Sequence, residues 1–246
     1  MKPHCDDTGS VGRLSFRDRP SVRRLPAIAI ALLLFLLAGQ NPTHAAPSAA
    51  SEASTAHVYL LRGVLNIFSL GLDDIAAKLE RQGIPVTVAN FASWSSLADD
   101  AAARYRSGKV KTIVLVGHSS GATALPDMVA KLDRLDVPVK LAIGLDSVFR
   151  TGLTGRVGRY INFYIADGAG TPVEKRAGFR GSLENVNVAN VPGVGHMSIE
   201  KNEIMQQKVI SAIRSVVFGR SSPVAQKPRP GEASAGSAGG RVQLAH

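Results

Sequence analysis

Cysteine is almost absent from this chain of 246 residues. The single cysteine, Cys5, lies close to the start of the sequence, in a segment that we predict to be removed. Without that segment the protein has no disulfide and no thiol that could act as a nucleophile. The stability of the folded part must therefore come from packing.

Long hydrophobic runs are also scarce. The run AIAIALLLFLLA at 27–38 is shorter than the roughly 18 residues that a membrane span needs. Six basic residues precede it and small residues follow it, which is typical of a signal peptide. We predict a leader over 1–45, cut after Ala45, and export to the periplasm or the medium. The alternative is an uncleaved leader that associates with the membrane through 27–38.

Large apolar residues are nearly missing from the C-terminal end. Residues 219–246 consist mainly of Gly, Ser, Pro and Ala with scattered charges, which predicts a disordered tail. The net charge of +10 is spread over the chain: the leader and the tail each hold +3, so the part between them holds +4. Its basic residues form no basic and aromatic stripe, and we expect no nucleic-acid partner.

The middle of the chain alternates apolar strand-like and amphipathic helix-like segments. Predicted strands cover 57–63, 84–90, 111–117, 137–146 and 159–167, and predicted helices cover 72–83, 96–108, 122–135 and 201–219. This alternation predicts one α/β domain over 57–218, with a mostly parallel sheet flanked by helices, after a linker at 46–56. Only Ser147–Gly158 separates the last two strands, which leaves no room there for a cap domain.

A G-x-S-x-G motif, GHSSG at 117–121, follows the third predicted strand and precedes a helix. Gly117 and Gly121 suit the tight, strained turn that exposes a nucleophilic serine above such a sheet. Ser119 is therefore the candidate nucleophile. The Ser120 N–H, at the start of the helix, is the natural first donor to an oxyanion.

A serine hydroxyl needs a base, and the base needs an acid that orients it. His196, in VPGVGHMSIE, is the remaining candidate base, because the other histidines lie in the leader, the tail, the first strand or the serine turn. Asp146 and Asp167 both follow predicted strands, and either one completes the chain order Ser, acid, His.

These motifs resemble the α/β-hydrolase superfamily over about 57–218. GHSSG and GLD are similar to lipase-type members, and this resemblance implies Asp146 as the acid rather than Asp167. The segment LLRGVLNIFSLGLDDIAAKL resembles the opening of small bacterial hydrolase-like proteins, in which a Gly-containing loop supplies a second oxyanion donor. Carried onto this chain, that donor is the Val64 N–H. The resemblance implies a serine hydrolase acting on small-molecule or lipid esters.

Two other interpretations stay open on the sequence alone. A hydrolase fold can lack activity and act as a binding or envelope-associated protein, and the same triad can transfer an acyl group to an acceptor other than water. The sequence has no metal-binding or nucleotide-binding motif, so we expect no cofactor and no metal. Phe68, Trp94, Phe149 and Phe163 could line an acyl pocket, although most aromatic residues are expected in the core.

Overall fold

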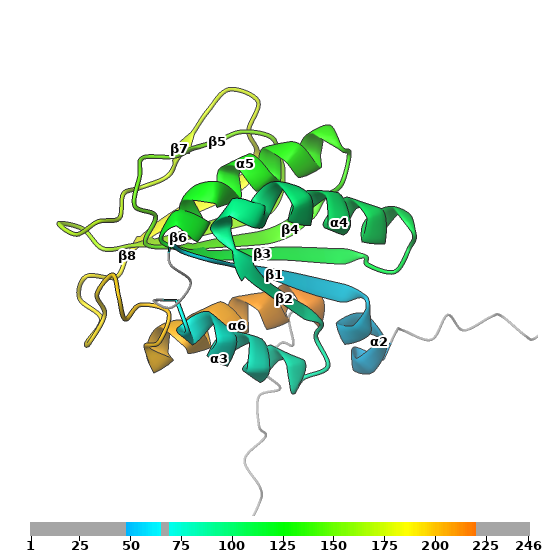
Figure 1. Cartoon of the computed structure of the whole chain (residues 1–246), viewed down its shortest axis with the longest axis horizontal. Helices are drawn as coiled ribbons and strands as arrows, with labels where there is room; N and C mark the ends of the chain where they lie inside the picture. Colours follow the sequence, from blue (N-terminus) through cyan, green and yellow to red (C-terminus); the bar gives the residue numbers. More distant parts are fainter. Residues whose placement is uncertain (1–47, 65–68, 220–246) are drawn as a thin grey trace, which may run out of the picture. The chain divides into compact units, whose positions relative to one another are not determined.

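Six strands form one sheet in the order β2-β1-β3-β4-β6-β8, and all five neighbouring pairs are parallel (Figure 1). The computed structural model describes residues 48–64 and 69–219, so the predicted leader and nearly all of the predicted tail lie outside the described residues. The strands are β1 (Ala56–Arg62), β2 (Val86–Asn90), β3 (Thr112–His118), β4 (Val139–Leu145), β6 (Arg156–Tyr164) and β8 (Arg180–Asn187).

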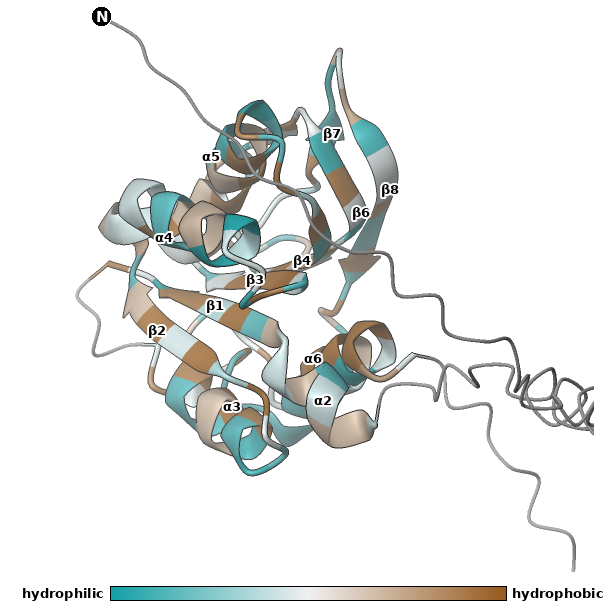
Figure 2. Cartoon of the chain, turned by 90° about the vertical axis from the view of Figure 1, so that its right-hand side faces the viewer, coloured by the Kyte–Doolittle hydropathy of each residue, from teal (hydrophilic) through white to brown (hydrophobic). Residues whose placement is uncertain are grey.

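Helices cover both faces of the sheet. Helices α4 (Trp94–Arg106) and α5 (Ser120–Arg134) lie on one face, and α3 (Gly71–Glu80) and α6 (Glu203–Val217) lie on the other (Figure 1). The central strands are mainly apolar on both sides, as their hydrophobic runs predict, and Figure 2 shows them largely in brown. Two hydrophobic clusters result, one between the sheet and each helix layer.

The predicted fold class is confirmed. Each predicted strand and helix of the middle region corresponds to an observed element, with ends that differ by a few residues. The chain between β4 and β6 contains only the two-residue strand β5 (Gly152–Leu153), which pairs with β7 (Glu174–Lys175). The described residues thus form an α/β-hydrolase-like domain in which no cap is inserted at this point.

Several short or peripheral elements were not predicted from the sequence, among them β8 and a helix near the start of the described residues. The edge strand β8 has the sequence RGSLENVN, its residues are exposed or half-buried, and much of it is teal in Figure 2 because most of its residues are polar. A strand without regular apolar alternation gives no periodic signal. The segment 46–56, predicted as a linker, contains the short helix α2 (Ala49–Ser54), whose first turn is capped by the Ser48 hydroxyl.

Candidate active site

Ser119 occupies the sharp turn between β3 and α5. Its backbone has φ 58° and ψ −122°, a left-handed conformation that is strained for a residue with a side chain. The Ser119 N–H donates to the Leu145 carbonyl at the end of β4, at 3.0 Å. The turn therefore holds the serine at the carboxyl edge of the sheet, where functional groups gather in parallel α/β folds.

Three glycines make room for this turn. A Cβ on Gly121 would overlap the carbonyl oxygen of Leu61 in β1, and a Cβ on Gly117 would overlap the backbone of Gly121. A Cβ on Gly63 would lie 3.0 Å from the Ser119 Cβ and 3.3 Å from its Oγ. Strand, helix and the loop after β1 thus meet closely around Ser119, as a serine turn of this kind requires.

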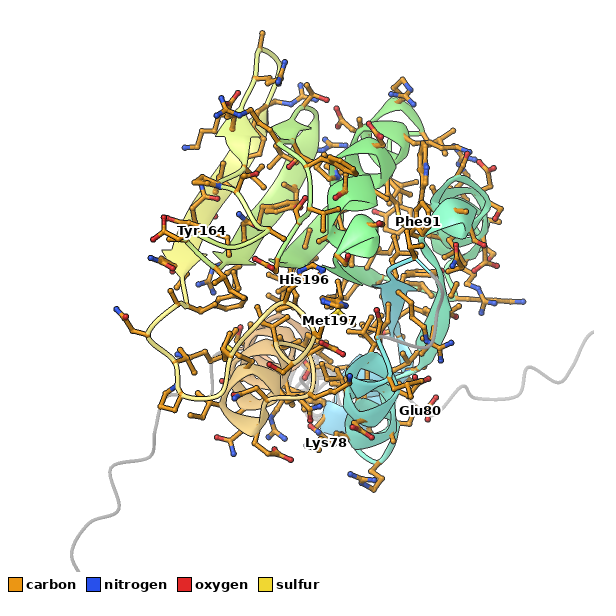
Figure 3. The ribbon with its side chains drawn as sticks, turned by 60° about the vertical axis from the view of Figure 1, so that its left-hand side comes forward. Lys78, Glu80, Phe91, Tyr164, His196 and Met197 are labelled. Carbon is orange, nitrogen blue, oxygen red and sulfur yellow. The ribbon has the colours of Figure 1, made fainter. Side chains whose placement is uncertain are left out.

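Ser119, His196 and Asp146 form one hydrogen-bonded chain. The Ser119 Oγ lies 3.1 Å from the His196 Nε2, and the His196 Nδ1 lies 2.6 Å from the Asp146 Oδ2. Because a carboxylate only accepts, Nδ1 holds the imidazole proton and Nε2 is left to accept from the serine hydroxyl. In the view of Figure 3, His196 lies between Tyr164, at the end of β6, and Phe91. This arrangement can remove the serine proton during attack on a carbonyl.

The Asp146 carboxylate is fully buried and fixed. Its second oxygen, Oδ1, accepts from the Ile165 N–H at 2.9 Å, and the Asp146 N–H donates to Phe163 at 2.8 Å. A Cβ on Gly170 would overlap Oδ1, so a glycine at that position lets the loop cover the carboxylate. Asp167, the alternative acid, is exposed in the turn after β6, and the carboxylate bonded to His196 is that of Asp146.

The two residues expected to donate to an oxyanion are both near Ser119: Ser120 follows it in the chain, and Val64 belongs to the loop after β1 that packs against it. Ser120 is the first residue of α5, so its N–H has no carbonyl partner one helical turn earlier. Val64 follows Gly63, the residue whose backbone lies against Ser119. Val64 and Ser120 line the same hollow of about 350 Å³.

Sequence reasoning missed the role of His118, which is 1% exposed. Its Nε2 lies 2.8 Å from the His196 carbonyl oxygen, an acceptor, so Nε2 holds the proton and Nδ1 accepts from the Ser69 hydroxyl at 2.8 Å. The Ser69 Oγ in turn accepts from the Gly63 N–H at 3.1 Å. His118 therefore connects the loop after β1 to the loop that holds the candidate base.

A second buried group, Glu200, lies behind His118. The Glu200 carboxylate is 0% exposed, and neither oxygen has a hydrogen-bond partner among the described residues. One oxygen lies 3.7 Å from the His118 Nε2, and the other lies 3.6 Å from the Lys201 Nζ. Burial raises the pKa of the Glu200 carboxyl and lowers the pKa of His118 to about 4. No sequence pattern marks this pair, because it forms only when the turn before α6 packs against the end of β3.

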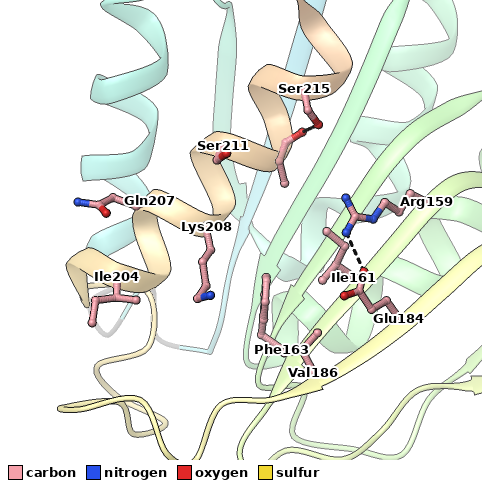
Figure 4. A pocket seen from close by; sticks show the side chains of 11 residues that line it. Arg159, Ile161, Phe163, Glu184, Val186, Ile204, Gln207, Lys208, Ser211 and Ser215 are labelled. Atoms are coloured by element: carbon pink, nitrogen blue, oxygen red, sulfur yellow. Dashed lines mark hydrogen bonds and ion pairs between the residues drawn. The ribbon is translucent and has the colours of Figure 1, made fainter. Parts of the chain in front are cut away.

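A larger hollow of about 730 Å³ lies between α6 and the strands β6 and β8 (Figure 4). Arg159 and Glu184 form an ion pair on its strand side, with 2.7 Å between the two groups. The described residues that line it include none of Ser119, His196 and Asp146. The hydrogen-bonded serine thus lies outside this hollow and next to the smaller one.

Two further observations concern the described part of the chain. Within 48–64 and 69–219, no cluster of His, Cys, Asp or Glu side chains has an arrangement that could hold a metal ion. No helix in these ranges is long and apolar enough to cross a membrane.

The comparisons with known proteins concern the fold. No family model and no curated protein matches the chain. A solved structure described as a hydrolase of the α/β superfamily, from Xanthomonas campestris pv. campestris, is 15% identical, with a TM-score of 0.41 over 65% of this chain and 98% of its own. The NocB thioesterase domain from the nocardicin cluster is 15% identical, with a TM-score of 0.42 over 69% and 97%.

An acetyl xylan esterase, solved as an iodinated complex, is 14% identical, with a TM-score of 0.37 over 67% of this chain and 99% of its own. The activities in these descriptions are those of the three neighbours. The parallel sheet, the helices on both faces and the serine turn after β3 give this chain an α/β-hydrolase-like fold.

Proposed function

We propose that the protein is a serine hydrolase that cleaves carboxylic esters through an acyl-enzyme. The observation that supports this most is the hydrogen-bonded chain from Ser119 through His196 to the buried Asp146. We also propose that the protein is exported, from the composition of the predicted leader. Sequencing the N-terminus of the protein recovered outside the cytoplasm tests this, with Ala46 as the expected first residue.

In the first half of the proposed reaction, the Ser119 Oγ attacks the acyl carbonyl carbon while the His196 Nε2 takes the hydroxyl proton. The carbonyl oxygen becomes an oxyanion, which the N–H groups of Ser120 and Val64 stabilise; a single such donor contributes about 3–4 kcal/mol in enzymes of this type. Asp146 stabilises the imidazolium. His196 then returns the proton to the alcohol oxygen, the C–O bond breaks, and the acyl group remains on Ser119.

In the second half, water replaces the alcohol. His196 takes a proton from the water as its oxygen attacks the acyl carbon, and the second tetrahedral intermediate collapses. The carboxylic acid leaves, and Ser119 regains its proton from His196. The net reaction consumes one ester and one water and yields one acid and one alcohol.

A fluorophosphonate probe, which reacts with activated serines, tests the proposal on the full-length protein. We expect Ser119→Ala and His196→Ala to abolish labelling and to reduce ester turnover by about 10⁴-fold or more, because both residues act in the same step. Asp146→Asn should reduce turnover by roughly 10³–10⁴-fold. Circular dichroism checks that each variant is folded.

Two matched variants serve as controls. Asp167→Asn changes the other candidate acid, and Ser182→Ala removes an exposed hydroxyl of β8 that donates to the Gly158 carbonyl. Both should label and turn over as the wild type does. A folded wild type that the probe does not label, or an unaffected Ser119→Ala variant, would contradict the proposal.

A further inference from the structure

The hollow of about 350 Å³ beside Ser120 has one wall made by a single face of α5. Ser120, Thr123, Ala124 and Asp127 line it at positions i, i+3, i+4 and i+7 of the helix. The hollow therefore begins at a proposed oxyanion donor and runs along the first two turns of α5. Because Ser120 directly follows Ser119 in the chain, the Ser120 end of the hollow lies next to the candidate nucleophile.

The rest of the lining is apolar. Phe91 and Ala92 lie in the 3-10 helix Phe91–Ser93 just before α4, Trp94 is the first residue of α4, and Val64 and Phe149 complete the lining. Val64 is 52% exposed and Phe149 is 65% exposed, and both rank among only five large apolar side chains that are exposed in the described residues. An exposed apolar lining around a concave site is typical of a binding site for an apolar ligand.

The polar groups of the hollow are few and lie at defined places. The Thr123 hydroxyl already contacts the Ser119 carbonyl at 3.2 Å and the Ser147 hydroxyl at 2.9 Å, so it needs no partner from a ligand. Asp127 is exposed and lies at the end far from Ser120. An apolar chain fits between these two ends, and a longer one would pass the carboxylate side chain.

The position of His196 decides which half of an ester this hollow suits. In the proposed reaction the leaving alcohol receives its proton from the His196 Nε2, so it must lie on the His196 side of the reacting carbon. The described residues that line the hollow come from the loops after β1, β2 and β4 and from α4 and α5, and none comes from the His196 loop. The hollow is therefore on the acyl side.

We infer that this hollow binds the acyl chain of the substrate, and that the preferred esters have medium-length, unbranched acyl chains of about six to ten carbons. The inference rests on the proposed function. From Ser120 to Asp127 the helix rises about 10 Å. An extended covalent chain advances about 1.2 Å per bond, so roughly eight bonds span this distance.

Kinetics with p-nitrophenyl esters from acetate to palmitate test the inference on the full-length protein. We expect kcat/KM to rise by roughly two- to fourfold per methylene, the factor that burial of a methylene gives, up to about eight carbons. It should fall at least tenfold from its maximum to the palmitate ester. A kcat/KM that is flat across the series would overturn the inference.

Two variants change the hollow at opposite ends. Ala124→Phe fills it near Ser120 and should lower the ratio of octanoate to acetate kcat/KM by at least twentyfold. Asp127→Leu removes the carboxylate at an exposed position and should shift the optimum toward twelve or more carbons. Asp74→Leu, at an exposed position of α3, is the matched control and should leave the profile unchanged.

Probe labelling separates this inference from the proposed function. If the wild type labels at Ser119 and hydrolyses acetate, but both variants keep the wild-type profile, the acyl hollow is wrong and the hydrolase remains. If the folded wild type neither labels nor hydrolyses any ester, the proposed function fails and the inference fails with it.

Discussion

His118 lies inside the G-x-S-x-G motif, but its side chain hydrogen-bonds to other loops of the site and not to Ser119. It stands between Gly117 and Ser119, yet its ring bonds the His196 carbonyl through Nε2 and the Ser69 hydroxyl through Nδ1. Its Nδ1 accepts from the Ser69 hydroxyl, whose oxygen in turn accepts a hydrogen bond from the Gly63 N–H. His118 thus acts as a positioning residue for both the proposed base and the proposed oxyanion loop.

Two substitutions separate this role from simple packing. His118→Gln keeps a donor at the place of Nε2, and His118→Asn keeps only an acceptor at the place of Nδ1. We expect kcat to fall roughly tenfold to a hundredfold in His118→Asn, because small displacements of a catalytic group are costly, and to stay within about threefold in His118→Gln. Steady-state kinetics with unchanged KM, at equal folded fractions, would show the effect. Equal losses in both variants would contradict it.

At the scale of elements, the packing of α5 against β1 depends on Gly121. A Cβ there would overlap the Leu61 carbonyl, and backbone cannot move aside as a flexible side chain can. We expect Gly121→Ala to reduce the free energy of unfolding by about 1–3 kcal/mol, the usual cost of overpacking, measured by urea denaturation. Gly195→Ala, whose nearest neighbour would be 3.6 Å away, should cost much less. If Gly121→Ala and Gly195→Ala had nearly the same free energy of unfolding, β1 and α5 would be able to shift and accommodate the added Cβ.

Elements also show how far the sequence predicts this structure. The apolar strands and amphipathic helices have clear periods, and the GHSSG motif marks the end of β3, so the fold and the position of Ser119 in its turn could be predicted. The strand β8 could not, because its polar sequence has no period. Either Asp146 or Asp167 suited the acid role, since both follow strands of the sheet. Only the fold brings Asp146 to His196 and leaves Asp167 exposed.

At the scale of the whole molecule, the buried pair His118 and Glu200 links stability to pH. Burial lowers the pKa of His118 to about 4, so between about pH 4 and 6.5 the unfolded chain binds more protons at this residue than the folded protein does. The contribution of His118 to the free energy of unfolding is therefore undiminished above pH 6.5 and decreases as the pH falls to 4. The total decrease is on the order of 3 kcal/mol.

Glu200 acts in the opposite direction. Burial raises the pKa of its carboxyl, so above about pH 4.5 the folded protein binds more protons than the unfolded chain, and stability falls as the pH rises. We expect the unfolding free energy of Glu200→Gln to rise more steeply from pH 4.5 to 6.5 than that of the wild type, and that of His118→Gln to rise less. Urea denaturation across this range measures all three slopes. The wild type and the two variants share every other titratable group. Three parallel curves of unfolding free energy against pH would therefore mean that neither buried group changes its proton binding on folding.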